Sequence, residues 1–364
     1  MRIAYLINSL DGYGAGLPVP MVTQFMKDSG ADVRLFALSK RDGRLAPVLA
    51  DAGLSVESGP EWNDLRGSLP AMAWLKDKLA AYKPTLLWTS LVRATLAGRA
   101  MGLMLKTPVV SWQHNTFLKP GNVAALALTR KLTQLWVADS QSVASVTKQR
   151  FHLLDKDVAV WPLFSADGAA PLAGHAKPGA PFRLGSLGRL HPHKGYDLLI
   201  KAMAELARKQ PELARGFTVT IGGDGPDRKR LEHLARAHDL ENLNFAGYQE
   251  DARRFLASLN GYLQPSRVEG LCIAAHEAMQ AGLPAIVTDV GELPYSVRDG
   301  ETGLIVPAGD PRALASAIGN LVSDRARAAA MGAAARRHVN ERFSTARFRE
   351  AGDAIMKTAG ELVR

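Results

Sequence analysis

One local pattern repeats along most of the chain: a short apolar stretch typical of a β-strand is followed by a longer segment with helical periodicity. In the first half, this pattern predicts strands at residues 2–7, 32–37, 86–89, 108–112 and 135–138. Helices are predicted between them, at residues 70–82, 93–105 and 140–151. Because such alternation is typical of parallel sheets covered by helices on both faces, the sequence predicts a doubly wound α/β fold.

The alternation stops near residues 166–181, where a stretch rich in Ala, Gly and Pro predicts a linker. Beyond it, strands are expected at residues 183–188, 217–222, 243–246, 261–264, 285–288 and 304–306. Helices are expected at residues 196–209, 228–238, 311–323, 325–343 and 345–363. A chain of 364 residues is long enough for two domains. We therefore predict Rossmann-like domains over 1–165 and 182–343, facing each other across an interdomain cleft that favours ligand binding.

Composition restricts the class of protein. The chain has 47% apolar and 22% charged residues, and no apolar run approaches the roughly 18 residues of a membrane-spanning helix. The lone Cys272 excludes an internal disulfide and a multi-cysteine metal site, and the first residues predict a strand and not a signal peptide. These features predict a cytoplasmic protein.

The net charge of +10 is concentrated in residues 1–165, which carry +7. Such an excess fits contact with anionic lipid at the inner face of the cytoplasmic membrane, with nucleic acid or with polyphosphate. It fits a solvated basic surface equally well.

Two glutamates follow the strand predicted at 261–264. Glu269 lies in a turn just before a helix expected from about residue 272 to 281, and Glu277 lies inside that helix. Backbone N–H groups at a helix N-terminus attract phosphate, whereas carboxylates repel it and accept hydrogen bonds from hydroxyl groups. A helix end for phosphate beside two carboxylates for hydroxyls indicates a nucleotide-sugar site.

A second motif, Gly188-Arg-Leu-His-Pro-His-Lys-Gly195, stands where another predicted strand ends and a helix begins. Arg189 and Lys194 are suited to neutralise a diphosphate leaving group. Alternatively, Arg189 and Lys194 are two exposed surface cations on a loop. The matching position of Glu269 at another strand end favours the diphosphate interpretation. His191 and His193 are interpreted as loop residues and not as metal ligands.

Glycine-rich turns follow two further predicted strands. In Ile221-Gly-Gly-Asp-Gly-Pro226, Gly223 is expected to line the ligand pocket, and Asp224 to form the turn or cap the next helix. The first turn contains Gly14-Ala-Gly16, but its spacing and the prolines after it disfavour dinucleotide binding. We interpret Gly14 as a point where donor or acceptor approaches the backbone.

Three further features leave alternatives open. His114, directly after the strand predicted at 108–112, either contacts a sugar or acceptor hydroxyl or is a buried structural histidine. A helix expected from about Asn122 either packs on the sheet or lies on a membrane surface. Asp155-Lys-Asp157 is interpreted as a solvated turn, and no other cluster has metal-ligand spacing.

These motifs, in this order, resemble the retaining glycosyltransferases of family four (glycosyl transferases group 1), which have the GT-B fold. The resemblance covers about residues 183–343 and is extended by Glu277-Ala-Met-x-Ala-Gly-Leu-Pro284, Asp289-Val-Gly291 and Asp299-Gly-Glu-Thr-Gly303. In the first half, His114 resembles the histidine that lies near the donor sugar in this family. Asp139-Ser140 resembles the family's Ser-bearing stretch before a helix. The turn after Gly16 departs from the family's Gly-Gly-x-Glu pattern, which leaves the acceptor open.

The resemblance implies a nucleotide-diphosphate-sugar donor bound mainly by the second domain. Arg189 and Lys194 would hold the diphosphate, Glu277 the ribose and Glu269 the sugar, and His114 would contact donor or acceptor. The further donor contacts would be Gly14, Gly223, Tyr248, Gly270, Leu271 and Cys272. Residues 344–364 would form a helix packing on the first domain. Neither a metal nor a cofactor is implied, because two cations replace the metal and the donor is a substrate.

The resemblance also implies transfer with retention of configuration to a glycan or lipid-linked hydroxyl, in bacterial cell-surface polysaccharide, lipopolysaccharide or glycolipid synthesis. A UDP-sugar is the favoured donor and a GDP-sugar the second choice. The alternative enzymes are a nucleotide-sugar epimerase or a sugar phosphorylase on the same fold. A basic nucleic-acid-binding protein is a remote alternative without a recognition motif, so no nucleic acid partner is expected.

Overall fold

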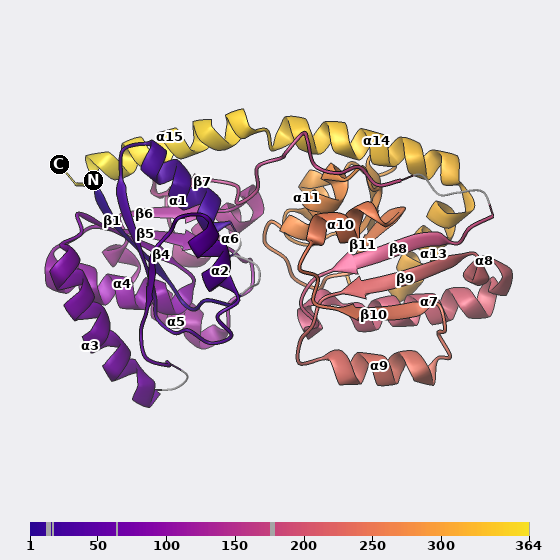
Figure 1. The fold of residues 1–364 in the computed structure, drawn as a ribbon, viewed down its shortest axis with the longest axis horizontal. Helices are drawn as coiled ribbons and strands as arrows, with labels where there is room; N and C mark the ends of the chain where they lie inside the picture. Colours follow the sequence, from indigo (N-terminus) through magenta and orange to yellow (C-terminus); the bar gives the residue numbers. More distant parts are fainter. Residues whose placement is uncertain (12–15, 17, 63–64, 175–178, 364) are drawn as a thin grey trace. The chain divides into compact units, whose positions relative to one another are not determined.

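The structure is a computed structural model that describes residues 1–364 apart from 12–15, 17, 63–64, 175–178 and 364. Gly14, one of the predicted donor contacts, lies outside the described residues. The chain divides into two compact units (Figure 1). Unit 1 comprises Met1–Leu163 and Ala346–Arg364, and unit 2 comprises Phe164–Thr345. Each unit is a Rossmann-like α/β domain, as the alternation predicts.

Within its described residues, unit 1 has one seven-stranded sheet in the order β3-β2-β1-β4-β5-β6-β7, and all neighbours are parallel. The strands are β1 (Arg2–Ile7), β2 (Asp32–Ala37), β3 (Val56–Ser58), β4 (Leu86–Ser90), β5 (Val109–Gln113), β6 (Leu135–Ala138) and β7 (Val158–Val160). The helices are α1 (Val19–Asp28), α2 (Leu45–Asp51), α3 (Leu65–Tyr82), α4 (Val92–Leu105), α5 (Pro120–Leu128), α6 (Gln141–Phe151) and α15 (Thr345–Glu361). Short 3-10 turns occupy η2 (Arg130–Leu132) and η3 (Asp155–Asp157).

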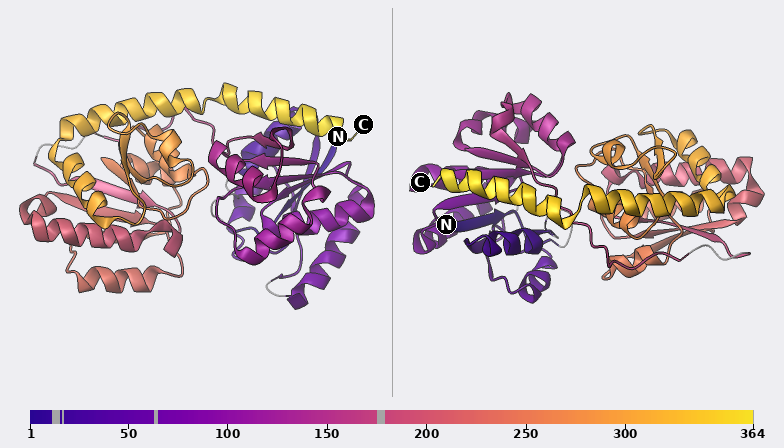
Figure 2. Two further views of the ribbon diagram at one scale, coloured as in Figure 1. Left: turned by 180° about the vertical axis from the view of Figure 1, so that it is seen from behind. Right: turned by 90° about the horizontal axis from the view of Figure 1, so that it is seen from above.

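Helix α15 is the last helix of the chain, and all but its first residue belongs to unit 1. The indole Nε1 of Trp161 donates a hydrogen bond of 3.0 Å to the Phe348 carbonyl, and the two rings lie 5.3 Å apart. Phe25 of α1 contacts both rings edge to face. These buried aromatic contacts attach α15 beside α1, where Figures 1 and 2 show it.

Unit 2 contains a six-stranded parallel sheet, again counting described residues, in the order β10-β9-β8-β11-β12-β13. The strands are β8 (Phe182–Leu187), β9 (Phe217–Gly222), β10 (Leu243–Gly247), β11 (Gly261–Gln264), β12 (Ala285–Thr288) and β13 (Gly303–Val306). The helices are α7 (Tyr196–Lys209), α8 (Pro211–Arg215), α9 (Arg228–Ala237), α10 (Ala252–Ala257), α11 (Ile273–Gln280), α12 (Leu293–Ser296), α13 (Pro311–Ser323) and α14 (Arg325–Arg342). The 3-10 turn η4 spans Pro192–Lys194.

The first described part of the predicted linker lies along unit 2. The backbone N–H of Ala166 donates to the Phe343 carbonyl at 2.7 Å, and that of Ala173 donates to the Ala281 carbonyl at 2.8 Å. The Arg336 guanidinium of α14 donates to the Gly168 and Ala170 carbonyls. Because backbone hydrogen bonds and an arginine hold this segment, its described residues are part of the unit and not a free connection.

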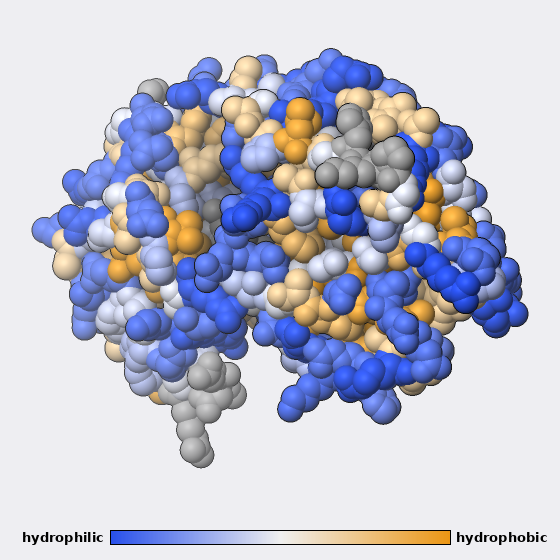
Figure 3. Space-filling view, turned by 45° about the vertical axis from the view of Figure 1, so that its right-hand side comes forward, coloured by the Kyte–Doolittle hydropathy of each residue, from blue (hydrophilic) through white to orange (hydrophobic). Residues whose placement is uncertain are grey.

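Hydrophilic side chains dominate the face shown in Figure 3, and apolar side chains form smaller areas between them. Among the described residues, no helix combines the length and the apolar character needed to cross a membrane.

Candidate active site

The carboxyl ends of the adjacent parallel strands β8 and β11 bring two predicted loops together in unit 2. The loop after β8 carries Arg189 and Lys194, and the loop after β11 carries Glu269. Gly195 has φ = 68°, and a Cβ at this position would lie 1.9 Å from the Pro265 carbonyl oxygen. The two loops therefore pack backbone to backbone, an approach that only glycine permits.

Lys194 and Glu269 form a direct ion pair, although the sequence analysis assigned them separate ligands. The distance from Lys194 Nζ to Glu269 Oε1 is 2.7 Å, with the side chains 25% and 7% exposed. Burial lowers the pKa of the Lys194 ammonium, but the negative charge of Glu269 more than compensates, so this pKa lies above its ordinary value. Lys194 is therefore a permanent cation with two further protons to donate to a ligand.

Glu269 is fixed by uncharged donors as well. Its Oε1 accepts hydrogen bonds from Ser266 Oγ at 2.6 Å and from Gln264 Nε2 at 3.0 Å. Tyr262 Oη in turn donates to Gln264 Oε1 at 2.7 Å. Three donors on one oxygen hold the carboxylate in a single orientation beside the strand end. Gln264 and Ser266 are not among the residues predicted for the site, although a polar residue at the end of a buried apolar strand is a usable signal.

Other glycine turns lie at the same edge of the sheet. Gly223 follows β9 with φ = 135°, and a Cβ there would lie 2.0 Å from the Gly188 carbonyl oxygen. The Gly223 N–H donates to the Gly247 carbonyl at 2.6 Å, and Tyr248 follows, 39% exposed. The structure therefore gathers Gly188, Gly223 and Gly247 beside the exposed Arg189.

The loop from Glu269 to Cys272 leads into α11. Cys272 precedes the helix in the left-handed conformation, with φ = 61°. A non-glycine residue costs roughly 1–2 kcal/mol there, and such residues cluster at functional sites. The Gly270 carbonyl accepts from the Glu292 N–H at 3.0 Å, and the Cys272 carbonyl lies 2.9 Å from His276 Nδ1. These contacts fix the backbone of Gly270 and Leu271 at the start of α11.

Glu277 lies within α11 and is partly buried. Burial raises the pKa of its carboxyl group to about 7, against a smaller opposing effect of Arg253. Within the described residues, its carboxylate makes no hydrogen bond. A desolvated acceptor without a protein donor is suited to the hydroxyl groups of a ligand.

His114 lies in unit 1, after β5, with its side chain 5% exposed. Its Nε2 lies 2.9 Å from Ser90 Oγ, and its Nδ1 lies 3.6 Å from Asp139 Oδ2. Tyr5 Oη lies 3.1 Å from Ser90 Oγ, and the Trp112 ring stacks on the imidazole. Both ring nitrogens thus face protein groups, as in the buried alternative. Ser90 and Tyr5 were not predicted as partners, although Ser90 ends β4 and Asp139 follows β6, two strand-end positions.

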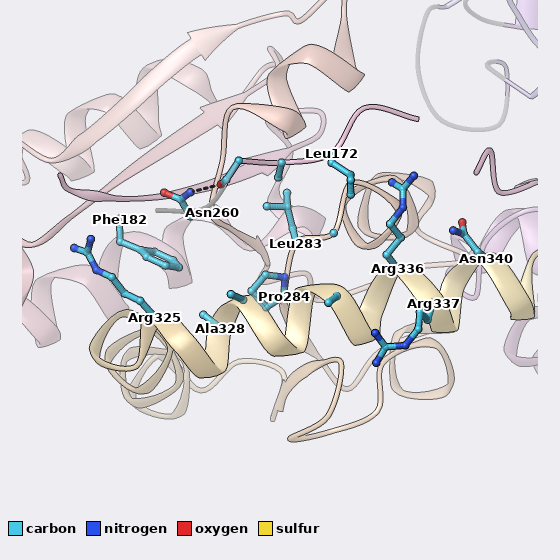
Figure 4. Close-up of a pocket in the computed structure, with 15 residues that line it drawn as sticks. Leu172, Phe182, Asn260, Leu283, Pro284, Arg325, Ala328, Arg336, Arg337 and Asn340 are labelled. Carbon is cyan, nitrogen blue, oxygen red and sulfur yellow. Dashed lines mark hydrogen bonds between the residues drawn. The ribbon is translucent and has the colours of Figure 1, made fainter. Parts of the chain in front are cut away.

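A separate cavity of unit 2 lies at the opposite edge of its sheet. It is lined by residues at or before the amino ends of β8, β11 and β12, such as Phe182, Asn260 and Pro284, and by α14 (Figure 4). None of the predicted site residues lines it. Among described residues, no group of three or more His, Cys, Asp or Glu is placed to hold a metal ion.

With this geometry, comparisons with known proteins define the class. A family model described as "Glycosyl transferases group 1" matches residues 172–338, which include every predicted site residue of unit 2. The solved structure of Anabaena Alr3699/HepE in complex with UDP-glucose superposes with a TM-score of 0.84 at 20% identity, covering 98% of this chain and 100% of that one. The fold is thus that of the GT-B glycosyltransferases, and residues 172–338 are similar to the group 1 glycosyltransferases.

Two curated relatives are similar over shorter segments. The GDP-mannose-dependent alpha-(1-6)-phosphatidylinositol monomannoside mannosyltransferase of Mycolicibacterium smegmatis is 35% identical over 162 residues, 41% of each chain. The lipopolysaccharide core biosynthesis mannosyltransferase LpcC of Rhizobium leguminosarum bv. viciae is 33% identical over 194 residues, 50% of this chain and 53% of the relative. The chain thus spans about half the length of these relatives.

Proposed function

We propose that the protein is a retaining glycosyltransferase that moves a sugar from a nucleotide-diphosphate sugar to a hydroxyl of a glycan or lipid-linked acceptor. The observation that carries the proposal is the buried Lys194–Glu269 pair, at the same sheet edge as Arg189 and beside the start of α11. Two cations suited to a diphosphate and a fixed carboxylate suited to a sugar hydroxyl lie within the segment that matches the family, which supports the proposal.

The donor half of the reaction follows from the charges of unit 2. Arg189 and Lys194 would bind the diphosphate, together with the backbone of Gly270, Leu271 and Cys272. Glu277 would accept hydrogen bonds from the ribose hydroxyls, which offset the cost of its burial. Gly223 and Tyr248 would line the nucleotide side, and Gly14 remains a proposed contact from unit 1.

Chemistry would proceed by front-face displacement. The bond from the anomeric carbon to the diphosphate oxygen breaks, and Arg189 and Lys194 stabilise the charge on the leaving group. The acceptor hydroxyl attacks from the same face and passes its proton to the departing phosphate. Glu269 orients the sugar and stabilises its developing positive charge. We propose that two cations make a metal and a cofactor unnecessary.

The acceptor half is assigned to unit 1, with His114 as its candidate residue. Its ring nitrogens face Ser90 and Asp139, and these neighbours would hold the imidazole in a fixed orientation toward the acceptor. The two curated relatives bear names in phosphatidylinositol mannoside and lipopolysaccharide core synthesis. They support a role in building a bacterial cell-surface glycan or glycolipid. We propose that this role is cytoplasmic, in contact with the membrane and without a nucleic acid partner.

A UDP-sugar is the favoured donor, and the GDP-mannose dependence of one relative keeps a GDP-sugar as the second choice. A thermal-shift panel of UDP, GDP, UDP-glucose and GDP-mannose tests the donor, because a bound ligand stabilises the folded chain. The true donor should raise the unfolding temperature of the wild type but not that of Glu277→Ala.

Transfer itself is tested with the labelled donor identified by the panel. Nucleoside diphosphate released only when an acceptor is present supports transfer, and an anomeric product analysis by NMR tests retention. Epimerised donor formed without any acceptor would replace the transferase by the epimerase alternative. Glu269→Gln serves as the matched catalytic control.

A further inference from the structure

Helix α5 of unit 1 is apolar on the side where a surface helix is normally polar. It spans Pro120–Leu128 and contains no charged residue, yet Leu126 is its only buried residue. A helix that is apolar all round is expected in a core or against a partner surface. Its outward positions Pro120, Ala124 and Leu128 are exposed, the last of them by 86%.

The end of helix α4 continues this apolar surface. Arg99 of α4 donates to the Leu126 carbonyl at 3.0 Å and to Thr129 Oγ1 at 2.7 Å, which holds the end of α5 against α4. Leu103 lies one turn beyond Arg99 on the same side of α4 and is 68% exposed. Met104 beside it is 56% exposed. Leu103, Met104 and Leu128 are thus exposed apolar side chains near the carboxyl ends of two helices that pack together, and we refer to them as the apolar patch.

The charged residues of the sequence segment that carries this patch have one sign. Residues 78–138 contain eight Lys and Arg and no Asp or Glu, and α6, which packs against α5, contains no acid either. Lys106 caps α4 at its carboxyl end and Lys131 lies in η2, directly after α5, and both are exposed. Exposed leucines on helices that are followed by exposed lysines, in a segment whose sequence contains no acid, match the interface of an anionic bilayer.

We infer that the outer face of α5, with Leu103, Met104, Lys106 and Lys131, docks on a membrane containing anionic phospholipid. The apolar side chains enter the interface and the two lysines bind lipid phosphates. Helix α5 begins six residues after His114, so a docked α5 lies close in the chain to the proposed acceptor half of the site. The inference rests on the proposed function in that a lipid-linked acceptor requires access to a bilayer.

The test is flotation of the full-length protein with vesicles of phosphatidylcholine, with and without phosphatidylglycerol, at low and high salt. Wild type should float with the anionic vesicles at low salt and separate from them at high salt. Leu103→Ser/Leu128→Ser should reduce binding about tenfold for each leucine. Lys106→Gln/Lys131→Gln should reduce it about fivefold for each lysine. Leu172→Ser, at a 63% exposed leucine of unit 2, is the matched control and should float like wild type.

Unchanged unfolding temperatures and an unchanged shift with nucleoside diphosphate show that the variants are folded. Failure of wild type to float, or equal flotation of all variants, overturns the docking surface. A wild-type dimer that Leu128→Ser dissociates would overturn it by assigning the face to a second copy of the chain. Sugar transfer to a soluble acceptor by a protein that does not float would support the proposed function and overturn the docking surface. Flotation without any sugar transfer would support the docking surface and overturn the proposed function.

Discussion

Glu277→Gln is expected to make the ligand-free protein more stable while removing donor binding. The carboxyl of Glu277 has an ordinary pKa of 4.5, and burial raises it to about 7 in the folded chain. A raised carboxyl pKa means that the folded state prefers the neutral form. The contribution of Glu277 to stability is therefore most favourable below pH 4.5 and is lost as the pH rises through 7.

The magnitude follows from the two pKa values. A tenfold change in a proton equilibrium corresponds to about 1.4 kcal/mol, so the charged Glu277 costs about 3 kcal/mol at pH 8 and about 1 kcal/mol at pH 5. Glutamine has nearly the same shape and carries no charge at either pH. The stability advantage of the variant should therefore grow by about 2 kcal/mol between pH 5 and pH 8.

Urea denaturation of wild type and variant across this pH range measures the difference, and thermal shifts with nucleotide sugar measure the lost binding. Glu292→Gln is the matched control, because Glu292 is buried but lies 2.6 Å from Arg342. Breaking that pair should destabilise the chain by about 3 kcal/mol. A Glu277→Gln variant that is no more stable than wild type at pH 8, or whose advantage is independent of pH, would refute the reasoning.

Four further outcomes are expected. Arg189→Ala and Lys194→Ala should each lower transfer at least 100-fold, roughly as the loss of one charge-stabilising group does. Only Lys194→Ala should also cost about 3 kcal/mol in urea, because it removes the cation 2.7 Å from the buried Glu269 carboxylate; equal losses of stability in the two variants would contradict this. Gly223→Ala should cost about 2 kcal/mol, because its Cβ would meet a backbone oxygen at 2.0 Å; an unchanged melting temperature would count against it. Burial lowers the pKa of His276 to about 4, so its contribution to stability is complete above pH 6.5 and is lost as the pH falls through 4. The stability of His276→Gln should therefore fall less steeply in acid than that of the wild type. An equally steep fall in the variant would show that His276 does not cause the acid loss. EDTA should leave transfer unchanged, and a loss restored by Mg²⁺ would overturn metal independence.

The buried strands of both sheets could be predicted because their apolar runs are unambiguous. β1, β2, β9 and β11 have the predicted bounds. The pattern does not predict β3 or α2, which are short and lie near the edge of the sheet. Edge elements are less buried, so their apolar residues follow a less regular pattern. Helix α3 begins at Leu65 and not at residue 70 as predicted, and Pro70 therefore lies inside the helix. Proline at the first turn is the usual signal, and tertiary packing overrides it here.

The strand-end positions of the candidate residues could be predicted from the sequence, but the contacts that these residues make could not. Strand ends and glycine turns located Arg189, Lys194 and Glu269, whereas the ion pair between the last two depends on left-handed turns that sequence spacing does not specify. Asp224 was expected to form the turn or cap α9. It accepts from the Gly225 N–H at 2.7 Å and so serves the turn, while the helix begins after Asp227 without a side-chain cap.

The placement of α15 in unit 1 has a consequence for synthesis on the ribosome. Unit 2 is continuous in sequence and can fold as soon as it emerges, whereas unit 1 must wait for the last residues of the chain. Until then Phe25 and Trp161 lack the cover that Phe348 provides. The nascent protein therefore passes through a stage in which unit 2 is folded while unit 1 still exposes apolar surface. Chaperones that bind apolar surface would act on unit 1 during that stage.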